Sequence, residues 1–413
     1  LKQRFPDAAV HAFTATATPN VRSDIVEQLG LKDPLVLVGD FFRPNLVYSV
    51  LRRGDANSDV LGAIRERKGQ AGIVYCIRRD DVDDLSRKLK SVGIRAIGYH
   101  AGMGDEMRTA AQDAFAAGEV DVVVATVAFG MGIDRADIRF VIHAAMPKSI
   151  EHYQQETGRA GRDGQQADCI LFYSPADRQL WKSIIESNET GDLDNKLRML
   201  EDLYRMCSGM SCRHRHLVSY FGQIWQHDNC GACDVCCGNV DVMPDSTVLA
   251  QKIMSAVART GERFGASHVA DVLMGEATDK VMERGHNDLS VFGLLTDTRK
   301  PEIMTWVDQL ADQGLLVRDG EYRVLKITPA GWQVLRSQGE AKLSRTTRGR
   351  RKSRKRAAEV SSTEQPDSMP LRPAAKCKAH ASKPIAPAES VPVEPLDVHA
   401  RDRYDRLRML RRA

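Results

Sequence analysis

Short apolar runs alternate with amphipathic stretches between residues 45 and 186, and this alternation restricts the chain to few folds. Six runs have the length and β-branched content of strands, at 46–50, 72–77, 94–99, 121–126, 139–143 and 168–173. Helical periodicity occupies the stretches 58–68, 80–92, 105–117, 149–155 and 176–186. The pattern predicts an α/β fold, in which a doubly wound parallel sheet has helices on both faces.

The carboxyl ends of parallel strands meet at one edge of a sheet, and open sheets bind their ligands there. Four loops are expected at that edge, at 76–79, 100–103, 126–135 and 158–162. Two of them also have a purely structural interpretation. A histidine at a strand end, such as His100, is more often hydrogen-bonded structure than a ligand, and the glycine-rich loop can simply pack beneath Phe129 and Met131.

The last of these loops carries two arginines three positions apart, in the stretch 154–164 (QQETGRAGRDG). Gly158 and Gly161 have no side chains to shield Arg159 and Arg162, so both guanidiniums can reach one compact anion. An arginine fork binds phosphate oxygens in a bidentate manner and stays charged at physiological pH. A solvated turn at the end of a helix is the alternative interpretation.

The first 40 residues have a weaker version of the same alternation. Apolar runs at 8–14 and 35–38 read as strands, and a helix between them, capped by Thr18 or Asn20, is expected to end near residue 29. Thr14 and Thr16 then stand at the carboxyl end of a strand. Turns rich in Ser and Thr are usually only turns, so this segment alone indicates little.

Four of the nine cysteines lie between residues 230 and 237, a spacing typical of a metal site in a reducing compartment. Two Cys-x-x-Cys steps and one cysteine upstream give four thiolates suited to tetrahedral Zn²⁺, from Cys212, Cys230, Cys233 and Cys236. Four further residues are close enough to compete, namely Cys207, His214, His216 and Cys237. Buried free thiols are the alternative interpretation.

Residues 246–340 have the pattern of a winged helix. Helices are expected at 248–259, 266–274 and 302–313, followed by a hairpin around Asp319-Gly320. Helix-turn-helix modules usually contact DNA through a helix and flanking basic residues. Tyr322, near the hairpin turn, can stack on a terminal base pair or pack against the wing.

The charge of the chain is unevenly distributed. From residue 341 onward there are 19 Lys/Arg and 8 Asp/Glu, a net charge of +11, whereas the whole chain carries only +4. Residues 342–356, which include Arg350 and Arg351, are expected to bind phosphates nonspecifically or to act as a solubilising linker. Residues 360–396 read as disordered, and residues 401–413 as a helix. No apolar run approaches the roughly 20 residues that span a bilayer.

Taken in order, five motifs resemble those of RecQ DNA helicases: 14–17 (TATA), 73–76 (IVYC), 99–102 (YHAG), 124–134 (VATVAFGMGID) and 154–164. The resemblance runs from residue 1 to about 340. It implies an ATP-dependent motor that moves 3′ to 5′ along DNA and is built from two RecA-like lobes with ATP between them. The domains it implies are a first-lobe remnant (1–40), a second RecA-like lobe (41–188), a helical zinc-binding subdomain (189–243), a winged-helix domain (244–340), a basic disordered linker (341–398) and the start of a helicase-and-RNaseD C-terminal domain (399–413).

The resemblance also implies roles for single residues. Arg162 would be the arginine finger and Arg159 the second contact to the γ-phosphate. The nucleotide and the closed cleft would be supported by Gln155, Gly132 and Asp134. The phosphates of a single strand would meet His100 and Thr126. Thr14 and Thr16 would couple hydrolysis to strand movement, and the zinc ligands would be the first four cysteines named above.

The chain also departs from this family. It contains no Gly-x-x-x-x-Gly-Lys-Ser/Thr and no Asp-Glu-x-His, which carry the phosphate cradle and the Mg²⁺ site. The chain begins with Leu1 in mid-pattern, and we expect it to be a fragment, cut at both ends, that neither hydrolyses ATP nor unwinds DNA by itself. The alternatives are a non-catalytic zinc and winged-helix DNA-binding protein and, less well supported, a remodeller that acts on RNA.

For the whole protein, the resemblance implies the cofactors ATP, Mg²⁺ and Zn²⁺, and a role in DNA repair, recombination and the SOS response. The expected partners are single-stranded, forked and duplex DNA, together with single-strand-binding protein and other repair factors. We expect a monomer without membrane contact, in the cytoplasm of a bacterium and associated with its nucleoid.

Overall fold

The computed structural model describes residues 9–127, 129, 135–187, 192–320 and 322–344. All of them belong to the larger of two compact units, Leu1–Ala375, and the smaller unit, Lys376–Ala413, lies outside the described residues. The expected basic linker beyond residue 344 and the expected helix at 401–413 therefore also lie outside them.

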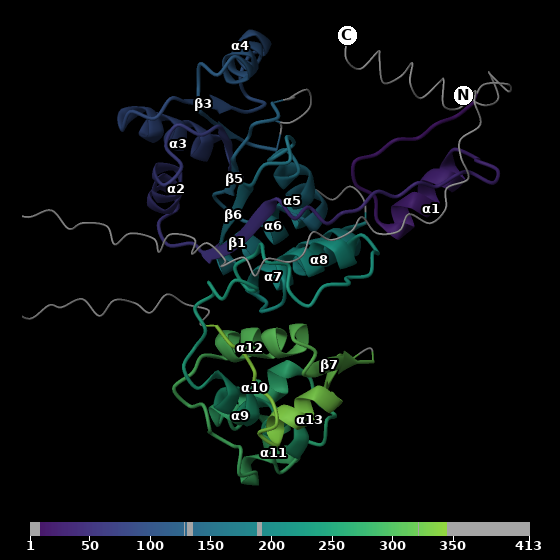
Figure 1. Cartoon of the computed structure of the whole chain (residues 1–413). Coiled ribbons are helices and arrows are strands. Elements are labelled where there is room, and N and C mark those ends of the chain that lie inside the picture. Colours follow the sequence, from purple (N-terminus) through teal and green to yellow (C-terminus); the bar gives the residue numbers. More distant parts are fainter. Residues whose placement is uncertain (1–8, 128, 130–134, 188–191, 321, 345–413) are drawn as a thin grey trace, which may run out of the picture. The chain divides into compact units, whose positions relative to one another are not determined.

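A wholly parallel, six-stranded sheet forms the core of the region between residues 46 and 173 (Figure 1). Its strands are β1 (Leu46–Arg52), β2 (Gly72–Tyr75), β3 (Ala96–Tyr99), β4 (Val122–Ala125), β5 (Phe140–His143) and β6 (Ala167–Tyr173), in the order β1-β6-β5-β2-β4-β3. Strands β2, β4 and β5 are buried along their whole length, as their continuous apolar sequences require. The predicted α/β fold is confirmed.

Helices cover both faces of the sheet and separate two hydrophobic cores. On one face, α2 (Ala56–Arg65) and α3 (Arg79–Ser91) pack on the side chains of Val74, Val124 and Ile142. On the other face, α4 (Asp105–Ala116) and α5 (Ile150–Thr157) pack on Ile73 and Val123. Helix α6 (Pro175–Ser187) follows β6 and adds Trp181 to this second core.

The loops 76–79 and 100–103 and the described start of the loop 126–135 lie at one edge of the sheet, as expected. Tyr75 at the end of β2 and Tyr99 at the end of β3 both pair with Ala125 of β4, so the loops that follow these strands are neighbours. The fourth expectation is wrong. The backbone of the arginine-bearing turn reaches the opposite edge, where Gly161 N–H donates to Ile138 O just before β5, while the Arg159 side chain reaches back to Tyr75 at the carboxyl end of β2. The reason is that α5 returns the chain to the amino ends of the strands before β6 begins.

The segment before the sheet is only partly as expected. Helix α1 (Pro19–Gln28) forms, with Thr18 as its N-cap, but it has no buried side chain. The strands expected at 8–14 and 35–38 are not formed by the described residues, and the side chains of Phe13, Leu35 and Leu37 are at least 78% exposed. A strand requires a neighbour to accept its backbone hydrogen bonds, and none of the described residues pairs with these two runs.

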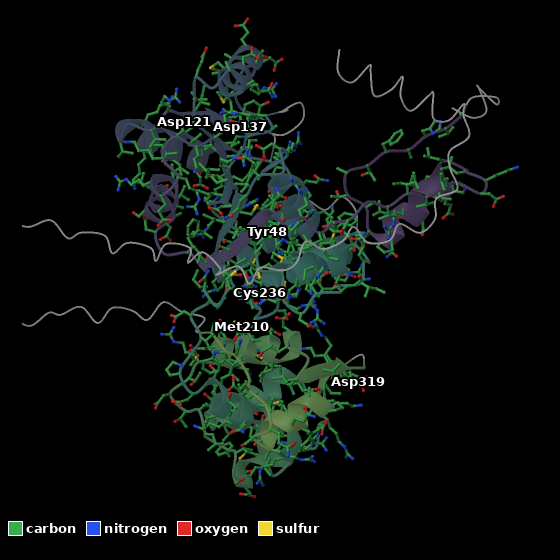
Figure 2. All side chains as sticks on the ribbon, viewed as in Figure 1. Tyr48, Asp121, Asp137, Met210, Cys236 and Asp319 are labelled. Atoms are coloured by element: carbon green, nitrogen blue, oxygen red, sulfur yellow. The ribbon has the colours of Figure 1, made fainter. Side chains whose placement is uncertain are left out.

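A helical subdomain follows the sheet and attaches to its edge. It comprises α7 (Leu193–Ser208), α8 (Arg213–Tyr220) and the cysteine-rich loop 230–237. Tyr48, on edge strand β1, is labelled in Figure 2. Its N–H donates to Ala232 O at 3.0 Å, and Asp234 N–H donates to Tyr48 O at 2.9 Å. The loop thus adds a short parallel pairing to the outer side of β1.

The last described region has a hydrophobic core of its own, as a winged helix should. The predicted helices are α9 (Ser246–Arg259), α10 (Ala266–Met274) and α12 (Lys300–Asp312), and the hairpin is β7 (Leu316–Asp319) with β8 (Val324–Ile327). Sequence periodicity did not indicate the short elements α11 (Asp279–Glu283), η1 (His286–Asp288) and α13 (Pro329–Leu335). Elements of seven residues or fewer complete too few turns to reveal a helical period.

Candidate functional site

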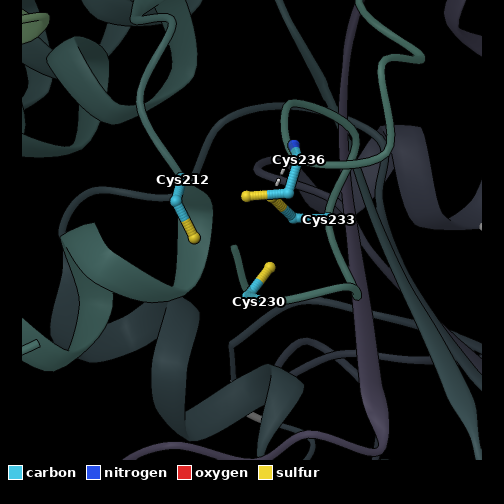
Figure 3. Close-up of side chains that lie close together, drawn as sticks. All are labelled: Cys212, Cys230, Cys233 and Cys236. Carbon is cyan, nitrogen blue, oxygen red and sulfur yellow. Dashed lines mark hydrogen bonds between the residues drawn. The ribbon is translucent and has the colours of Figure 1, made fainter. Parts of the chain in front are cut away.

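The structure brings together the four cysteines that the spacing singled out. The sulfur atoms of Cys212, Cys230, Cys233 and Cys236 all lie within 4.8 Å of one another and point toward a common centre (Figure 3). A tetrahedral Zn²⁺ with bonds of roughly 2.3 Å would separate its sulfur ligands by about 3.8 Å. This donor set fits a four-coordinate structural zinc, which has no open position for a substrate.

Backbone geometry presets this cluster. Cys212 is the N-cap residue of α8, and the N–H groups of Ala232 and Cys236 donate to the sulfurs of Cys230 and Cys233, each at 3.4 Å. Hydrogen bonds from Cys212 and Cys230 lower the pKa of the Cys233 thiol. The thiolate form is the one that binds a metal.

A buried ion pair, which sequence reasoning missed, ties the loop to its surroundings. Arg213 Nε lies 2.9 Å from Asp234 Oδ1, and the two side chains are only 2% and 3% exposed. The other oxygen of Asp234 accepts from Val50 N–H of β1 at 2.9 Å. The signal was present in the sequence, because each of these residues follows a cysteine of the cluster directly.

The four competing residues have other contacts. His214 Nε2 lies 3.2 Å from the carbonyl oxygen of Arg43, and His216 Nε2 lies 2.6 Å from a carboxylate oxygen of Asp312. Cys207 is buried in the core beside the sheet. The thiol of Cys237 donates to Gly231 O at 3.5 Å.

The turn with the two arginines begins where α5 ends at Thr157. Gly161 has a φ of +56°, and a Cβ there would lie 2.6 Å from the Asn45 side chain, so the residue must be glycine. Arg159 is half-buried and Arg162 is exposed. Both line a cleft of about 1060 Å³, together with Gln155 and residues from the segment 10–43.

Residues remote in sequence hold this turn. The Arg43 guanidinium donates to the carbonyl oxygens of Gly158, Ala160 and Gly161, each at 2.9 Å. The Asn45 amide also donates to Gly161 O, at 2.9 Å. Sequence reasoning assigned no role to Arg43 or Asn45, because nothing in the local pattern shows which turn they reach.

Beneath the turn lies a second buried pair. His143 Nε2 is 2.7 Å from Glu156 Oε2, and the side chains are 1% and 6% exposed. The ring of Tyr75 stacks on that of His143, with 5.3 Å between centroids. Burial first, and the Glu156 charge second, raise the pKa of Tyr75, whose side chain also hydrogen-bonds with Arg159. The arginine turn therefore contacts a buried polar layer formed by Tyr75, His143 and Glu156.

The two threonines near the start of the chain have different surroundings. The Gln155 amide donates to Thr16 Oγ1 at 3.1 Å, so Thr16 contacts the helix that leads into the arginine turn. The Thr14 hydroxyl donates to Thr16 O at 3.1 Å and stabilises the local bend of the chain. The structure thus brings Thr16 and Gln155 together across 139 residues of sequence.

The candidate strand-contacting residues are neighbours on the opposite edge of the sheet. His100 is only 8% exposed; its Nδ1 accepts from Gly102 N–H, and its Nε2 lies 3.2 Å from Asp83. Thr126 is half-buried, and its N–H donates to Tyr99 O. Gly132 and Asp134, expected near the nucleotide, lie outside the described residues.

Tyr322 is 87% exposed in the connection between β7 and β8. Its side chain is therefore open to solvent rather than buried against the wing. Arg350 and Arg351 lie outside the described residues. Within the described part of the chain, no helix is both long and apolar enough to cross a membrane.

Three parts of the chain match known protein families. Residues 55–164 match the helicase conserved C-terminal domain, residues 175–237 the RecQ zinc-binding family, and residues 241–353 the RQC domain. Together these matches cover most of the sheet-bearing lobe, the cysteine cluster and the winged helix.

Curated relatives extend the similarity over most of the chain. The ATP-dependent DNA helicase RecQ of Pasteurella multocida is 38% identical over 347 residues, which are 83% of this chain and 54% of the relative. The protein of the same name from Bacillus subtilis is 37% identical over 331 residues, which are 80% of this chain and 56% of the relative. The chain thus spans about half the length of these two relatives.

The same order of sheet-bearing lobe, four-cysteine loop and winged helix is found in the structure and in the family matches. The chain belongs to the RecQ family of helicases and carries its helicase C-terminal, zinc-binding and RQC domains.

Proposed function

We propose that the whole protein is an ATP-dependent DNA helicase that moves 3′ to 5′, and that this chain supplies its second motor lobe, zinc subdomain and winged helix. The observation that carries this proposal is the arginine turn. Arg159 and Arg162 line the same cleft as Gln155, whose amide contacts Thr16. A cleft lined by guanidiniums suits the phosphates of a nucleotide.

In this proposal Arg162 is the arginine finger and Arg159 contacts the γ-phosphate. Gln155, Gly132 and Asp134 support the nucleotide. ATP and Mg²⁺ bind chiefly to residues of the other motor lobe, since the phosphate-cradle and Mg²⁺ motifs do not occur in this chain. Thr14 and Thr16 couple hydrolysis to movement, because a contact between Thr16 and Gln155 that forms and breaks with lobe closure links the two halves.

DNA would bind away from the arginine turn. His100 and Thr126 would meet phosphates of the tracked strand at the carboxyl edge of the sheet, and exposed Tyr322 would stack on the end of the duplex. Arg350 and Arg351 would add nonspecific affinity that weakens with salt. Different loops of one lobe would thus serve ATP and DNA.

The cysteine cluster would hold a structural Zn²⁺. Bound there, the metal supplies folding free energy rather than catalysis. Cys212, Cys230, Cys233 and Cys236 would be its ligands, and the Arg213–Asp234 pair would orient the loop against β1. Elemental analysis of purified protein is expected to find one zinc per chain, and protein that is folded but free of zinc would contradict this assignment.

For the cellular role we propose repair and recombination of DNA, including the SOS response, on forked or partly single-stranded substrates. Single-strand-binding protein and other repair factors are the proposed partners. The proposed working form is a monomer in the cytoplasm of a bacterium, associated with the nucleoid. These proposals derive from the family, and co-purification from a bacterial host with tagged protein would test them.

The motor proposal is tested by supplying a nucleotide-binding lobe. The first half of the Pasteurella multocida relative, joined ahead of residue 41, is expected to give DNA-stimulated ATPase and unwinding. In this fusion, Arg162→Ala is expected to lower kcat by about 10³-fold or more, as for other arginine fingers. Arg87→Ala is the matched control, because Arg87 is 74% exposed in a surface ion pair.

The chain by itself is expected to bind DNA without hydrolysing ATP. DNA-stimulated ATPase from these 413 residues alone would contradict the assignment of the catalytic motifs to another lobe. The fusion could fold and bind ATP, and its Arg162→Ala variant could have the same kcat as the parent fusion. That result would favour the alternative of a non-catalytic zinc and winged-helix DNA-binding protein.

A further inference from the structure

The Arg43 side chain occupies an unusual position. Its guanidinium donates to three carbonyl oxygens of the arginine turn, although Arg43 lies at least 115 residues away in sequence. A guanidinium has five N–H donors in a rigid plane, so a single side chain can hold three acceptors in a set arrangement. A lysine ammonium at the same place would keep the charge but lose this planar fork.

The three carbonyls belong to residues next to the two functional arginines. Gly158 and Ala160 flank Arg159, and Gly161 directly precedes Arg162. The last carbonyls of a helix have no partner within the helix, and a cation at that end is favourable. By holding these carbonyls, Arg43 sets the peptide planes from which Arg159 and Arg162 project.

Arg43 is itself held from the other side by the zinc subdomain. His214, on α8, lies with Nε2 3.2 Å from Arg43 O, two residues after the cysteine ligand that begins the helix. Phe42, next to Arg43, makes an edge contact with the His214 ring, with centroids 5.0 Å apart. Phe41 stacks on Phe221 at 4.4 Å.

A glutamine completes this attachment. The Gln223 side chain accepts from Phe41 N–H and donates to Gly39 O, both at 3.0 Å. Residues 39–43 are thus attached to the zinc subdomain by backbone hydrogen bonds and aromatic packing. Residues 35–38, which directly precede them, are exposed.

We propose that Arg43 is the positioning residue of the arginine turn, and that the zinc subdomain sets the position of Arg43 through His214 and the aromatic contacts of residues 39–43. Three segments then move as one body when the motor opens and closes: the arginine turn, residues 39–43 and α8. This inference rests on the proposed motor function for its catalytic consequence, but not for its structural one.

The structural consequence is tested on the chain as it stands, by hydrogen exchange followed by mass spectrometry. Arg43→Ala and Arg43→Lys are both expected to speed exchange at least 10-fold in peptides covering residues 158–164. Zinc content and exchange in the winged helix should not change. His214→Gln is expected to speed exchange at residues 41–43 and, more weakly, in the turn. Arg87→Ala is again the control and should change neither.

The catalytic consequence is tested in the fusion that carries a nucleotide-binding lobe. Arg43→Lys is expected to lower kcat of the DNA-stimulated ATPase by about 10²-fold, the cost of a small misplacement of a catalytic group. KM for ATP and affinity for DNA are expected to change less than 3-fold, since the Arg43 guanidinium is already engaged by three carbonyl oxygens of the turn. A purely structural role would instead lower the amount of active protein and leave kcat per active site unchanged.

The outcomes separate the two proposals. If the parent fusion has no ATPase, the motor proposal fails, while the exchange experiment still decides the role of Arg43. If the parent is active and Arg43→Lys keeps both its kcat and the slow exchange of the turn, the positioning role is overturned. If Arg43→Ala loses its zinc or fails to fold, the decision passes to Arg43→Lys and His214→Gln, and unchanged exchange of the turn in both overturns the proposal.

Discussion

The zinc loop at 230–237 and the arginine turn at 158–164 are both short, glycine-containing loops that present functional side chains, but they are stabilised in different ways. The zinc loop contains three of the four ligands, and the fourth begins the helix just upstream. The arginine turn is held mainly by side chains from outside it: Arg43 and Asn45 come from the segment before β1, and Arg139 pairs with Asp163 of the turn. Residues of the zinc loop itself supply most of its stabilising groups, whereas residues distant in sequence supply most of those of the arginine turn.

This difference has a consequence for robustness. A metal site concentrates its stabilisation in a single ion, so the loss of one ligand removes most of it. The arginine turn distributes its stabilisation over several hydrogen bonds, each worth about 1 kcal/mol. We therefore expect abrupt failure in the zinc loop and graded loosening in the arginine turn.

The largest effect is expected from the zinc loop itself. Cys233→Ser should abolish zinc retention and unfold the loop together with α8, because binding of a structural Zn²⁺ contributes about 10 kcal/mol or more to folding. Cys237→Ser is the control, since the Cys237 thiol donates to Gly231 O and is not one of the four clustered sulfurs. Zinc content and far-ultraviolet circular dichroism measure the effect. Zinc lost from Cys237→Ser and kept by Cys233→Ser would reverse the ligand assignment.

The next effect concerns the buried ion pair beside the cluster. Asp234→Asn leaves the Arg213 charge buried without its counter-charge and is expected to destabilise the subdomain by about 3–5 kcal/mol. Asp84→Asn, in an ion pair that is more than half exposed, is expected to cost less than about 1 kcal/mol. Urea unfolding measures both. Equal shifts in the two variants would show that burial is not what makes the first pair important.

A smaller effect is expected in the arginine turn. Asn45→Ala removes the amide that donates to Gly161 O and Gln165 O, and is expected to cost about 1–2 kcal/mol. Because Arg43 still holds the turn, hydrogen exchange of residues 158–164 should increase less in Asn45→Ala than in Arg43→Ala. An Asn45→Ala effect as large as that of Cys233→Ser would break the distinction between the two loops.

The smallest change in stability is expected in the winged helix, which contains neither the four clustered cysteines nor the arginine turn. Burial first, and His286 at 2.7 Å second, lower the pKa of His268 to about 4. The unfolded chain, with a His pKa near 6.5, binds this proton more readily than the folded one. The stability due to neutral His268 is therefore complete above about pH 6.5 and is lost as the pH falls toward 4.

This pH dependence can be measured by urea unfolding of the winged helix at pH 7 and at pH 5. His268→Gln is expected to flatten the difference between the two midpoints, while His11→Gln, at an exposed position, should leave it unchanged. The charged groups that act on His268 besides His286 are Lys280, Asp271 and Lys300. A wild-type midpoint that does not fall between pH 7 and pH 5 would contradict the lowered pKa.

Much of the fold followed from local patterns. Apolar runs and helical periods located all six strands of the sheet and most helices, because a two-layer covering of a parallel sheet imposes both periods on the chain. The pairs Tyr48–Ala232 and Thr16–Gln155 could not be foreseen, since their partners are more than 130 residues apart. The exposed runs at 9–14 and 35–38 were predicted to be strands and are not, because a strand-like composition does not supply a neighbouring strand to pair with.

The sequence by itself determined the parallel sheet, the grouping of the four cysteines and the identity of the arginine turn, because each depends on residues close together along the chain. Only the tertiary structure decided which edge of the sheet carries that turn, and that Arg43 and His214 connect it to the zinc subdomain. The physical reason is that hydrogen bonds depend on distance in space. The chain has to fold before a guanidinium at residue 43 can meet carbonyls near residue 160.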